Sequence, residues 1–293
     1  MQTLQALQSS IDSVSNLKSI VRTMKAHAST NILQFQHAAE ASMNYRKVLD
    51  MAIYVALSED EQGDQKEDQG DTTLHIVFGS DHGLAGRFNE RIANYAVENV
   101  GSSEKNVLIT VGQQVYRRLE SIYDIHATLS IPQTSDGVTP VVQKLLVEIE
   151  ELRSNHKLVK IILHYCKPLR KTGYEEESEV LFPLDLSKFA QKTMSWESKR
   201  LPTYTMDRQL LVSEIIRQYF FITLYRSFCY SLVSENTSRI ESMTAAEKNI
   251  EEKLEELNFS YRTQRQNGIT EEINDVVSGF KAIKSRKEEE KSG

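Results

Sequence analysis

The chain has 293 residues, of which 40% are hydrophobic and 26% are charged, and its mean hydropathy is negative. This balance argues against a disordered, collagen-like or membrane-inserted chain, and no apolar run approaches the roughly 20 residues that a bilayer-spanning helix needs. The net charge of -6 argues against nucleic acid as a partner. Two cysteines, Cys166 and Cys229, are too few for a disulfide framework or a four-ligand zinc site, so we expect reduced thiols. The first residues lack the pattern of a secretion signal, which predicts that the chain stays where it is made.

Glycine and proline divide the chain into three parts. Neither residue occurs in residues 1–62 or 203–267, and all five prolines lie between residues 132 and 202. Because proline costs about 3 kcal/mol and glycine about 1 kcal/mol inside a helix, the two uninterrupted stretches predict two very long helices. The expected parts are a coiled-coil helix, an acidic linker, an α/β domain, a second coiled-coil helix and a charged tail, at residues 1–58, 59–71, 72–202, 203–283 and 284–293.

Apolar or small residues recur in steps of three and four along the first long helix, as a coiled-coil seam requires. The seam is interrupted by a slip of about one position after Val14, and Ser42 is its one polar member. The expected seam is Leu4, Leu7, Ile11 and Val14, followed by Leu17, Val21, Met24, Ala28, Ile32, Phe35, Ala39, Ser42, Tyr45, Leu49, Ile53 and Ala56.

The last part of the chain carries a similar stripe. Helices of about 55 residues or more would be roughly 80 Å long, and neither could bury such a stripe alone. The simplest arrangement is antiparallel pairing of the two ends, and a bundle of shorter helices is the alternative. The second stripe is Ile215, Tyr219, Ile222, Tyr225, Phe228, Leu232, Ile240, Met243, Ala246, Ile250, Leu254, Leu257, Tyr261, Ile269, Ile273, Val276, Phe280 and Ile283.

The middle of the chain alternates between strand and helix patterns. Short apolar runs predict buried strands, and the segments between them predict helices, so we expect a mainly parallel sheet with right-handed crossovers. The expected strands are 74–78, 107–111 and 158–165, with weaker ones at 125–129 and 179–182, and the expected helices are 87–100 and 141–153.

The segment Gly79–Gly86 is the sharpest local motif, because it joins a predicted strand to a predicted helix. As a phosphate cradle it lacks the P-loop lysine and the G-x-G-x-x-G spacing, and as a nucleophile turn it lacks the central serine. The favoured interpretation is a tight turn in which Asp81 is the cap and glycines such as Gly83 and Gly86 allow positive φ.

Other chemistry-bearing residues form no recognisable site. The seven histidines are dispersed in the sequence, which argues against a metal site. The acidic run Glu175–Glu179 is interpreted as a solvated turn before a strand, and Cys229 as a small core residue. We therefore expect no catalytic residues, no metal, no cofactor and no small-molecule substrate, and a mechanical role is favoured over catalysis.

Several separated segments carry a family resemblance. They are SVSNLKSIVRTMKAHAS at 13–29, VFGSDHGLAGRFN at 77–89, SENTSRIESMTAA at 234–246, YRTQRQNGITEEI at 261–273 and VVSGFKA at 276–282. In this order and spacing they resemble the γ subunit of rotary F-type ATP synthases over essentially the whole chain.

The resemblance implies a rotor shaft without an active site of its own. Its terminal helices would form an antiparallel coiled coil inside a hexamer of α and β subunits, and its Rossmann-like domain would lie against the ε subunit and the membrane c-ring. The chain would be peripheral to the cytoplasmic face of a prokaryotic plasma membrane. Ion flow through the ring would be coupled to ATP synthesis or hydrolysis at the hexamer.

The matched positions also imply contact residues. Met24 and Lys25 resemble the collar that meets the β-subunit lever, and Arg239 corresponds to it on the partner helix. Arg265, Gln266 and Thr270 match polar positions that contact the β catch loop. A solvated helix surface is the alternative for all six.

Some positions depart from the family pattern. Ala85 replaces a cysteine in the central turn, Gly268 loosens the last helix, and a charged tail follows Ile283. These departures resemble an alternative (N-type) branch of F-type ATPases more than the housekeeping enzyme, and the transported ion, proton or sodium, stays open.

Two other functions compete with the rotor. One is a coiled-coil tether with a regulatory domain. The other is a small enzyme that uses the turn Gly79–Gly86 to bind a nucleotide or phosphoester.

Overall fold

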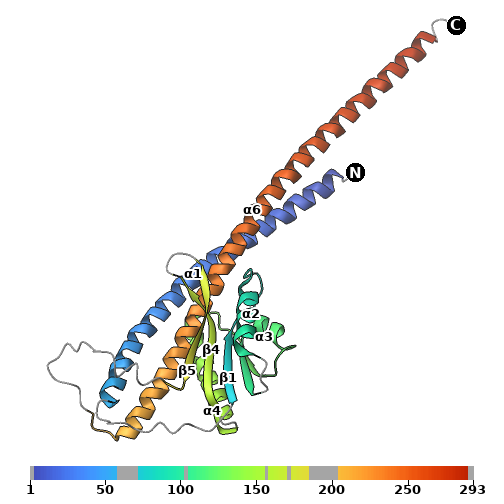
Figure 1. Ribbon diagram of the computed structural model, residues 1–293. Helices are drawn as coiled ribbons and strands as arrows, with labels where there is room; N and C mark the ends of the chain where they lie inside the picture. Colours follow the sequence, from blue (N-terminus) through green and yellow to red (C-terminus); the bar gives the residue numbers. More distant parts are fainter. Residues whose placement is uncertain are drawn as a thin grey trace. The chain divides into compact units, whose positions relative to one another are not determined.

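The computed structural model describes residues 3–57, 72–101, 105–155, 158–169, 173–184 and 204–289 (Figure 1). Two compact units make up the chain. The terminal unit consists of Met1–Lys25 and Met243–Gly293, and the central unit of Ala26–Ser242. The predicted acidic linker and the last residues of the predicted tail lie outside the described residues.

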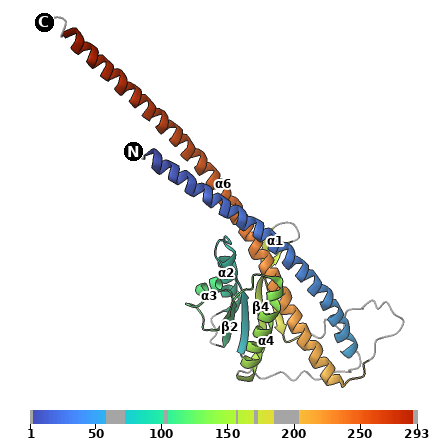
Figure 2. The same ribbon diagram turned by 180° about the vertical axis from the view of Figure 1, so that it is seen from behind.

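Two long helices run through both units. Helix α1 spans Leu4–Leu57 and helix α6 spans Arg208–Glu289, so each is continuous and the alternative of several shorter helices is wrong. In each unit, residues of α1 and α6 pack side by side, and the predicted pairing of the terminal helices is confirmed (Figures 1 and 2). Helix α6 begins five residues later than position 203 and extends beyond position 283.

The seam of α1 differs from the predicted one at two places. Leu17 and Tyr45 are 51% and 43% exposed, so neither lies in the seam. The neighbouring residues Lys18 and Arg46 are half-buried there instead, and each lies four residues after one seam residue and three before the next. Both are cations paired with carboxylates, Lys18 with Glu251 and Arg46 with Glu179. Apolar spacing alone therefore placed the slip wrongly.

The central unit contains one five-stranded sheet in the order β3-β2-β1-β4-β5. Strands β1 to β4 are parallel, β5 is antiparallel to β4, and the mainly parallel sheet is thus confirmed. The order of the parallel strands is that of a doubly wound, Rossmann-like sheet. The strands are β1 Thr72–Phe78, β2 Asn106–Val111, β3 Ile125–Leu129, β4 Leu158–Pro168 and β5 Tyr174–Phe182.

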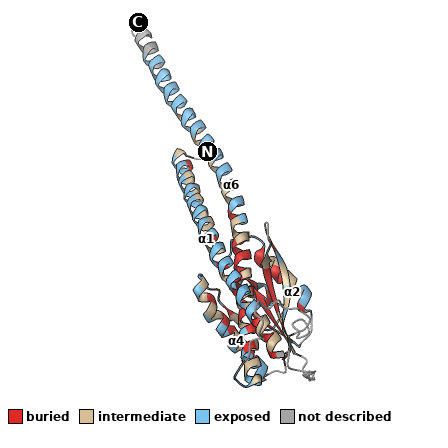
Figure 3. Ribbon diagram, turned by 90° about the vertical axis from the view of Figure 1, so that its left-hand side faces the viewer, coloured by how far each residue is buried: buried red, intermediate tan, exposed pale blue. Residues whose placement is uncertain are grey.

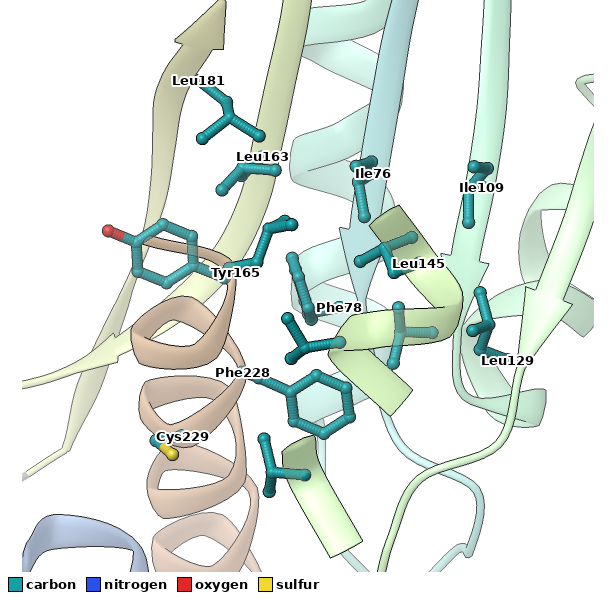
Figure 4. Packing of buried hydrophobic residues seen from close by; sticks show 14 of the residues in the cluster. Ile76, Phe78, Ile109, Leu129, Leu145, Leu163, Tyr165, Leu181, Phe228 and Cys229 are labelled. Atoms are coloured by element: carbon teal, nitrogen blue, oxygen red, sulfur yellow. The ribbon is translucent and has the colours of Figure 1, made fainter. Parts of the chain in front are cut away.

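Helices cover both faces of this sheet. Helices α2 (Phe88–Val100) and α3 (Gln113–Leu119) pack on one face, and α4 (Val138–Asn155) and α6 pack on the other. Alternation along β1 directs Ile76 and Phe78 to the second face and Val77 to the first. Figure 4 shows Phe78 and Tyr165 of the sheet beside Phe228 of α6. The short helix α3 and the 3-10 turn η1 (Ser135–Gly137) were not predicted.

Burial of α6 is concentrated in the central unit, where the sheet lies on one side of the helix and α1 on another (Figure 3). Cys229 is buried in this core, as predicted, and both cysteines are free thiols. Small polar residues on α6 let the sheet approach closely. The buried serines and threonine are Thr223, Ser227, Ser231, Ser234 and Ser238.

The acidic run Glu175–Glu179 lies inside strand β5, so its interpretation as a solvated turn is wrong. Consecutive carboxylates pair with cations on different neighbouring elements. Glu176 pairs with Arg91 of α2 at 2.6 Å, and Glu177 pairs with Lys167 of β4 at 2.8 Å. A run of glutamates is compatible with a strand because these partners compensate the charge.

The fold also brings two histidines together that the sequence separates. His75 of β1 and His164 of β4 are buried and stacked, with 2.9 Å between His75 Nδ1 and His164 Nε2. His164 Nδ1 lies 2.8 Å from the Ser178 hydroxyl. Burial lowers the pKa of His75 to about 4 and that of His164 to about 3. Both rings are therefore neutral at pH 7, where each can donate one hydrogen bond and accept another.

We expect this pair to make the central unit acid-sensitive. In the unfolded chain both histidines take up protons near pH 6.5, whereas in the folded chain they do so only at about pH 4 and below. Stability should therefore fall as the pH drops from 6.5 towards 4, with a loss of about 3 kcal/mol from His75 alone. Urea unfolding at pH 7 and pH 4.5 measures this loss.

The matched comparison is the double variant His75→Gln/His164→Gln against His27→Gln, because His27 is exposed. The double variant should lose less stability between the two pH values than the wild type, and His27→Gln should behave like the wild type. Equal losses in all three proteins would contradict the assignment.

Candidate functional site

A ladder of charges connects α1 and α6 in the terminal unit. Glu247 accepts hydrogen bonds from Arg22 Nε at 2.7 Å and from Lys25 Nζ at 2.8 Å, and Lys18 Nζ lies 2.8 Å from Glu251. Hydrogen bonds from Arg22 and Lys25 lower the pKa of Glu247 to about 2. The charge of the predicted contact residue Lys25 is thus engaged within the coil, and the neighbouring Met24 is half-buried.

Helix α6 continues beyond the first residues of α1 in the same unit (Figure 1). The apolar stripe persists along this extension, but its side chains are 49–73% exposed. We call this set the tip stripe: Ile269, Ile273, Val276, Phe280 and Ile283. A regularly spaced row of large apolar side chains facing water is typical of a helix that binds another protein.

The three predicted polar contact residues at this end lie just before or within the tip stripe. Arg265 and Gln266 are exposed, so both side chains are accessible. The Thr270 hydroxyl donates to the Gln266 carbonyl oxygen at 2.9 Å, which leaves its lone pairs to accept hydrogen bonds. Arg239 belongs to the central unit instead, where its guanidinium contacts Glu235 at 2.5 Å.

The turn Gly79–Gly86 is held by its own polar groups. Asp81 Oδ1 accepts from the Gln113 amide at 3.0 Å and Oδ2 accepts from the Ile131 amide at 2.7 Å, so this carboxylate joins two further loops. The Ser80 amide donates to Asn89 Oδ1 at 2.9 Å. With an acceptor-only carboxylate occupying these amides, the geometry favours a structural turn over a phosphate cradle.

The same turn docks on α6. The Ser238 hydroxyl donates to the Ala85 carbonyl oxygen at 2.8 Å and accepts from the Tyr174 hydroxyl at 3.3 Å. Gly86 has a φ of +54°, and a Cβ there would lie 3.3 Å from Ser238 Oγ. Gly83 lacks the predicted positive φ, which belongs to Leu84 at 64°.

A buried carboxyl lies on α6 near this turn. Glu235 is buried, and burial raises its pKa although the charge and hydrogen bond of Arg239 oppose the shift. Asp81 raises the pKa of Glu235 further, and His82 lowers it. Glu235 and Arg239 therefore compensate each other's charge, which gives these two residues of the segment SENTSRIESMTAA a structural role.

A second buried charge cluster, which the sequence did not predict, lies around Glu179. Glu179 of β5 accepts from Arg226 Nη2 of α6 at 2.6 and 2.7 Å, from Arg46 Nη1 of α1 at 3.1 Å and from the Tyr165 hydroxyl at 3.1 Å. Burial opposes ionisation of Glu179, but the two guanidinium groups outweigh it and hold its pKa below the ordinary value. The sequence signal for this cluster is the acidic run itself, because the side chains of a strand alternate between the two faces of the sheet. The run carries this signal only when it is interpreted as a strand.

Within the described ranges, no three His, Cys, Asp or Glu side chains come together as a metal ion would need. No helix in the described part of the chain is both long and apolar enough to cross a bilayer.

The terminal helices pair, the segment between them in sequence folds as a doubly wound sheet, and one helical end extends alone. These features define a coiled-coil protein with an inserted Rossmann-like domain. Comparison with known proteins matches residues 3–283 to the family described as ATP synthase. The chain is 28% identical to the ATP synthase gamma chain of Clostridium kluyveri, over 96% of this chain and 98% of that one. It is 24% identical to that of Mycoplasmopsis agalactiae, over 97% and 100%.

Solved structures agree on the fold. A chain in the Euglena gracilis mitochondrial ATP synthase, solved with OSCP, F1 and c-ring, has a TM-score of 0.63 at 13% identity and covers 97% of this chain and 95% of its own. A chain of the Tetrahymena thermophila central stalk and c-ring has a TM-score of 0.52 at 17% identity, covering 78% and 99%. The protein belongs to the family of ATP synthase gamma chains, the central-stalk subunits of F-type ATP synthases. The alternative branch stays a prediction.

The turn supplies a matched pair of glycine substitutions. Gly86→Ala should destabilise the central unit by about 1–2 kcal/mol, because alanine disfavours the positive φ and crowds Ser238. Gly83→Ala should be neutral or slightly stabilising, since a Cβ there meets no described atom within 4 Å. Urea unfolding measures both, and equal effects would show that the turn is not tightly packed on α6.

Proposed function

We propose that this chain is the rotating shaft that couples ion flow through a membrane ring to ATP synthesis or hydrolysis at a hexamer of α and β subunits. The observation that carries this proposal is the tip stripe, which leaves an apolar helix end exposed beyond its partner helix. Family membership and a place in the synthase with F1 and the c-ring are its background.

The tip stripe suits a bearing. Its apolar side chains gain free energy when a sleeve of the hexamer removes them from water, and hydrophobic contact has no preferred direction. A helix end held in this way can be retained and still turn. Polar side chains near Ile269, where the stripe begins, would instead make contacts that depend on the angle of rotation.

We assign these angle-dependent contacts to β subunits. Arg265, Gln266 and Thr270 would meet the β catch loop, Met24 and Lys25 the β lever, and Arg239 would contact a β subunit from the central unit. Because an asymmetric coil presents different faces to chemically identical β subunits, it would bias them towards different conformations and nucleotide affinities. Rotation would then change which β subunit holds which state.

We also propose contacts for the inserted α/β domain. The domain expected at 72–202 would contact the ε subunit and the c-ring, and the protein would be peripheral at the cytoplasmic face of the membrane. Nucleotides would bind to the hexamer, so the chain would contribute to catalysis without carrying catalytic residues, a cofactor or a metal. The transported ion is left open.

The direct test is reconstitution of the complete membrane complex with and without this chain. Only the complex that contains the chain should couple ATP hydrolysis to ion transport, and the purified chain should hydrolyse no ATP. Removing residues 269–293 should abolish this coupling, whereas a tether would keep working. Coupled transport without the chain would contradict the proposal, and nucleotide binding by the isolated chain that Gly83 substitution abolishes would favour an enzyme.

A double substitution tests the bearing separately. Val276→Ser/Phe280→Ser should leave the unfolding of the free chain unchanged, because both side chains are more than 70% exposed. It should weaken assembly with the hexamer by about tenfold or more, since each apolar side chain contributes on the order of 1.5–3 kcal/mol when buried. Titration of the labelled chain with α and β subunits measures the effect.

Glu271→Gln is the matched control, because Glu271 is exposed on the opposite side of the same helix turns. It should assemble as the wild type does. Equal affinity of the double variant and this control would mean that the tip stripe is not buried in the complex.

A further inference from the structure

The carboxylate of Glu179 connects three structural elements at one point in the central unit. Glu179 belongs to β5 at the edge of the sheet, Arg226 to α6 and Arg46 to α1. A single Arg226 nitrogen lies within hydrogen-bond distance of both carboxylate oxygens, at 2.6 and 2.7 Å. Arg46 binds one of these oxygens from the other helix at 3.1 Å.

Further contacts fix the cations themselves. The Arg46 guanidinium donates to the Tyr219 hydroxyl and to Thr223 Oγ1, both on α6, and lies 4.7 Å from the centre of the Tyr219 ring. The Tyr165 hydroxyl of β4 donates to the second Glu179 oxygen at 3.1 Å. The carboxylate thus accepts hydrogen bonds from both helices and from the neighbouring strand, and its surroundings are largely closed to solvent.

This cluster differs in kind from the contacts around it. The surrounding interface of the sheet with α1 and α6 combines apolar packing, with Phe78 and Phe228 among its members, and neutral hydrogen bonds such as that from the Ser234 hydroxyl to the Cys166 carbonyl oxygen at 3.0 Å. Apolar contacts have no preferred direction, so their resistance to sliding comes only from the interlocking of side chains. Charged hydrogen bonds to a carboxylate are short and directional, so they resist shear.

We propose that Glu179 is a positioning residue that fixes the angular setting of the sheet against both helices, so that torque passes between the central domain and the coil without slip. The proposal rests on the rotor function proposed above. Loss of the carboxylate charge would leave Arg46 and Arg226 facing each other across the cluster, and the sheet would then be held to the coil by apolar contacts and neutral hydrogen bonds.

The test compares Glu179→Gln with Glu177→Gln in membrane vesicles that contain the complete complex. Glu177 lies on the same strand and pairs with Lys167 at 2.8 Å, but this pair is more exposed to solvent: the Lys167 side chain is 42% exposed and that of Glu177 is 35% exposed. The measured quantity is the number of ions transported per ATP hydrolysed. Glu179→Gln should lower this ratio at least twofold at an unchanged rate of hydrolysis, and Glu177→Gln should keep the wild-type ratio.

The outcomes separate this proposal from the rotor function. If the wild-type chain itself restores no coupling, the rotor function fails. If the wild type couples and a folded, assembled Glu179→Gln complex keeps the wild-type ratio, the positioning role is overturned. It is also overturned if Glu177→Gln lowers the ratio as much as Glu179→Gln does.

A milder variant decides the matter should Glu179→Gln fail to assemble. Arg46→Gln leaves the Arg226–Glu179 pair in place and releases only α1 from the cluster. A ratio below that of the wild type supports the positioning role, and an unchanged ratio in an assembled complex contradicts it. Glu179→Asp, which keeps the charge, should restore part of the ratio lost in Glu179→Gln.

Discussion

The structure depends on one constraint: two helices of 54 and 82 residues each carry an apolar stripe that neither can bury by itself. Within the central unit α6 meets this constraint by packing against both α1 and the sheet, which buries residues such as Leu224, Phe228 and Leu232. On this face of the sheet, one apolar cluster therefore joins residues of the α/β domain to residues of both long helices. The inserted domain is held by the same helix that forms the coil.

Charged residues give this apolar packing its register. Lys18 and Arg46 occupy seam positions of α1, and each pairs with a carboxylate, Glu251 and Glu179. An apolar seam alone tolerates sliding by a turn, whereas a cation in the seam is stable only opposite its partner. In the terminal unit the ladder around Glu247 has the same effect between α1 and α6. Such pairs suit a coil that must carry torque along its length.

Much of the fold could be predicted because its signals are local. The absence of glycine and proline indicated α1 and α6, and apolar runs indicated β1, β2 and β4. The seam slip at Leu17 was wrong because apolar spacing cannot indicate that Lys18 has Glu251 opposite it. Only the end of strand β5 was predicted, because the charges of its glutamates are compensated by residues distant in sequence, such as Arg91.

The candidate site was predictable to a lesser degree. Family resemblance indicated the contact residues, and those positions still await a test, but only the structure separates Arg239 from the residues of the terminal unit. The contacts Arg46–Glu179 and His75–His164 join residues more than eighty positions apart in sequence, which is beyond the range of any periodicity. Gly83 and Gly86 had the same signal in sequence, yet only Gly86 adopts a positive φ.

Rotation itself is the most direct measurement of the account. A cysteine introduced at Glu98, which is exposed on α2, can carry an optical probe selectively because Cys166 and Cys229 are buried. With the hexamer fixed to a surface, addition of ATP should turn the probe in steps in one direction. A probe that stays still while the same complexes hydrolyse ATP would contradict the role of this chain as the rotating shaft.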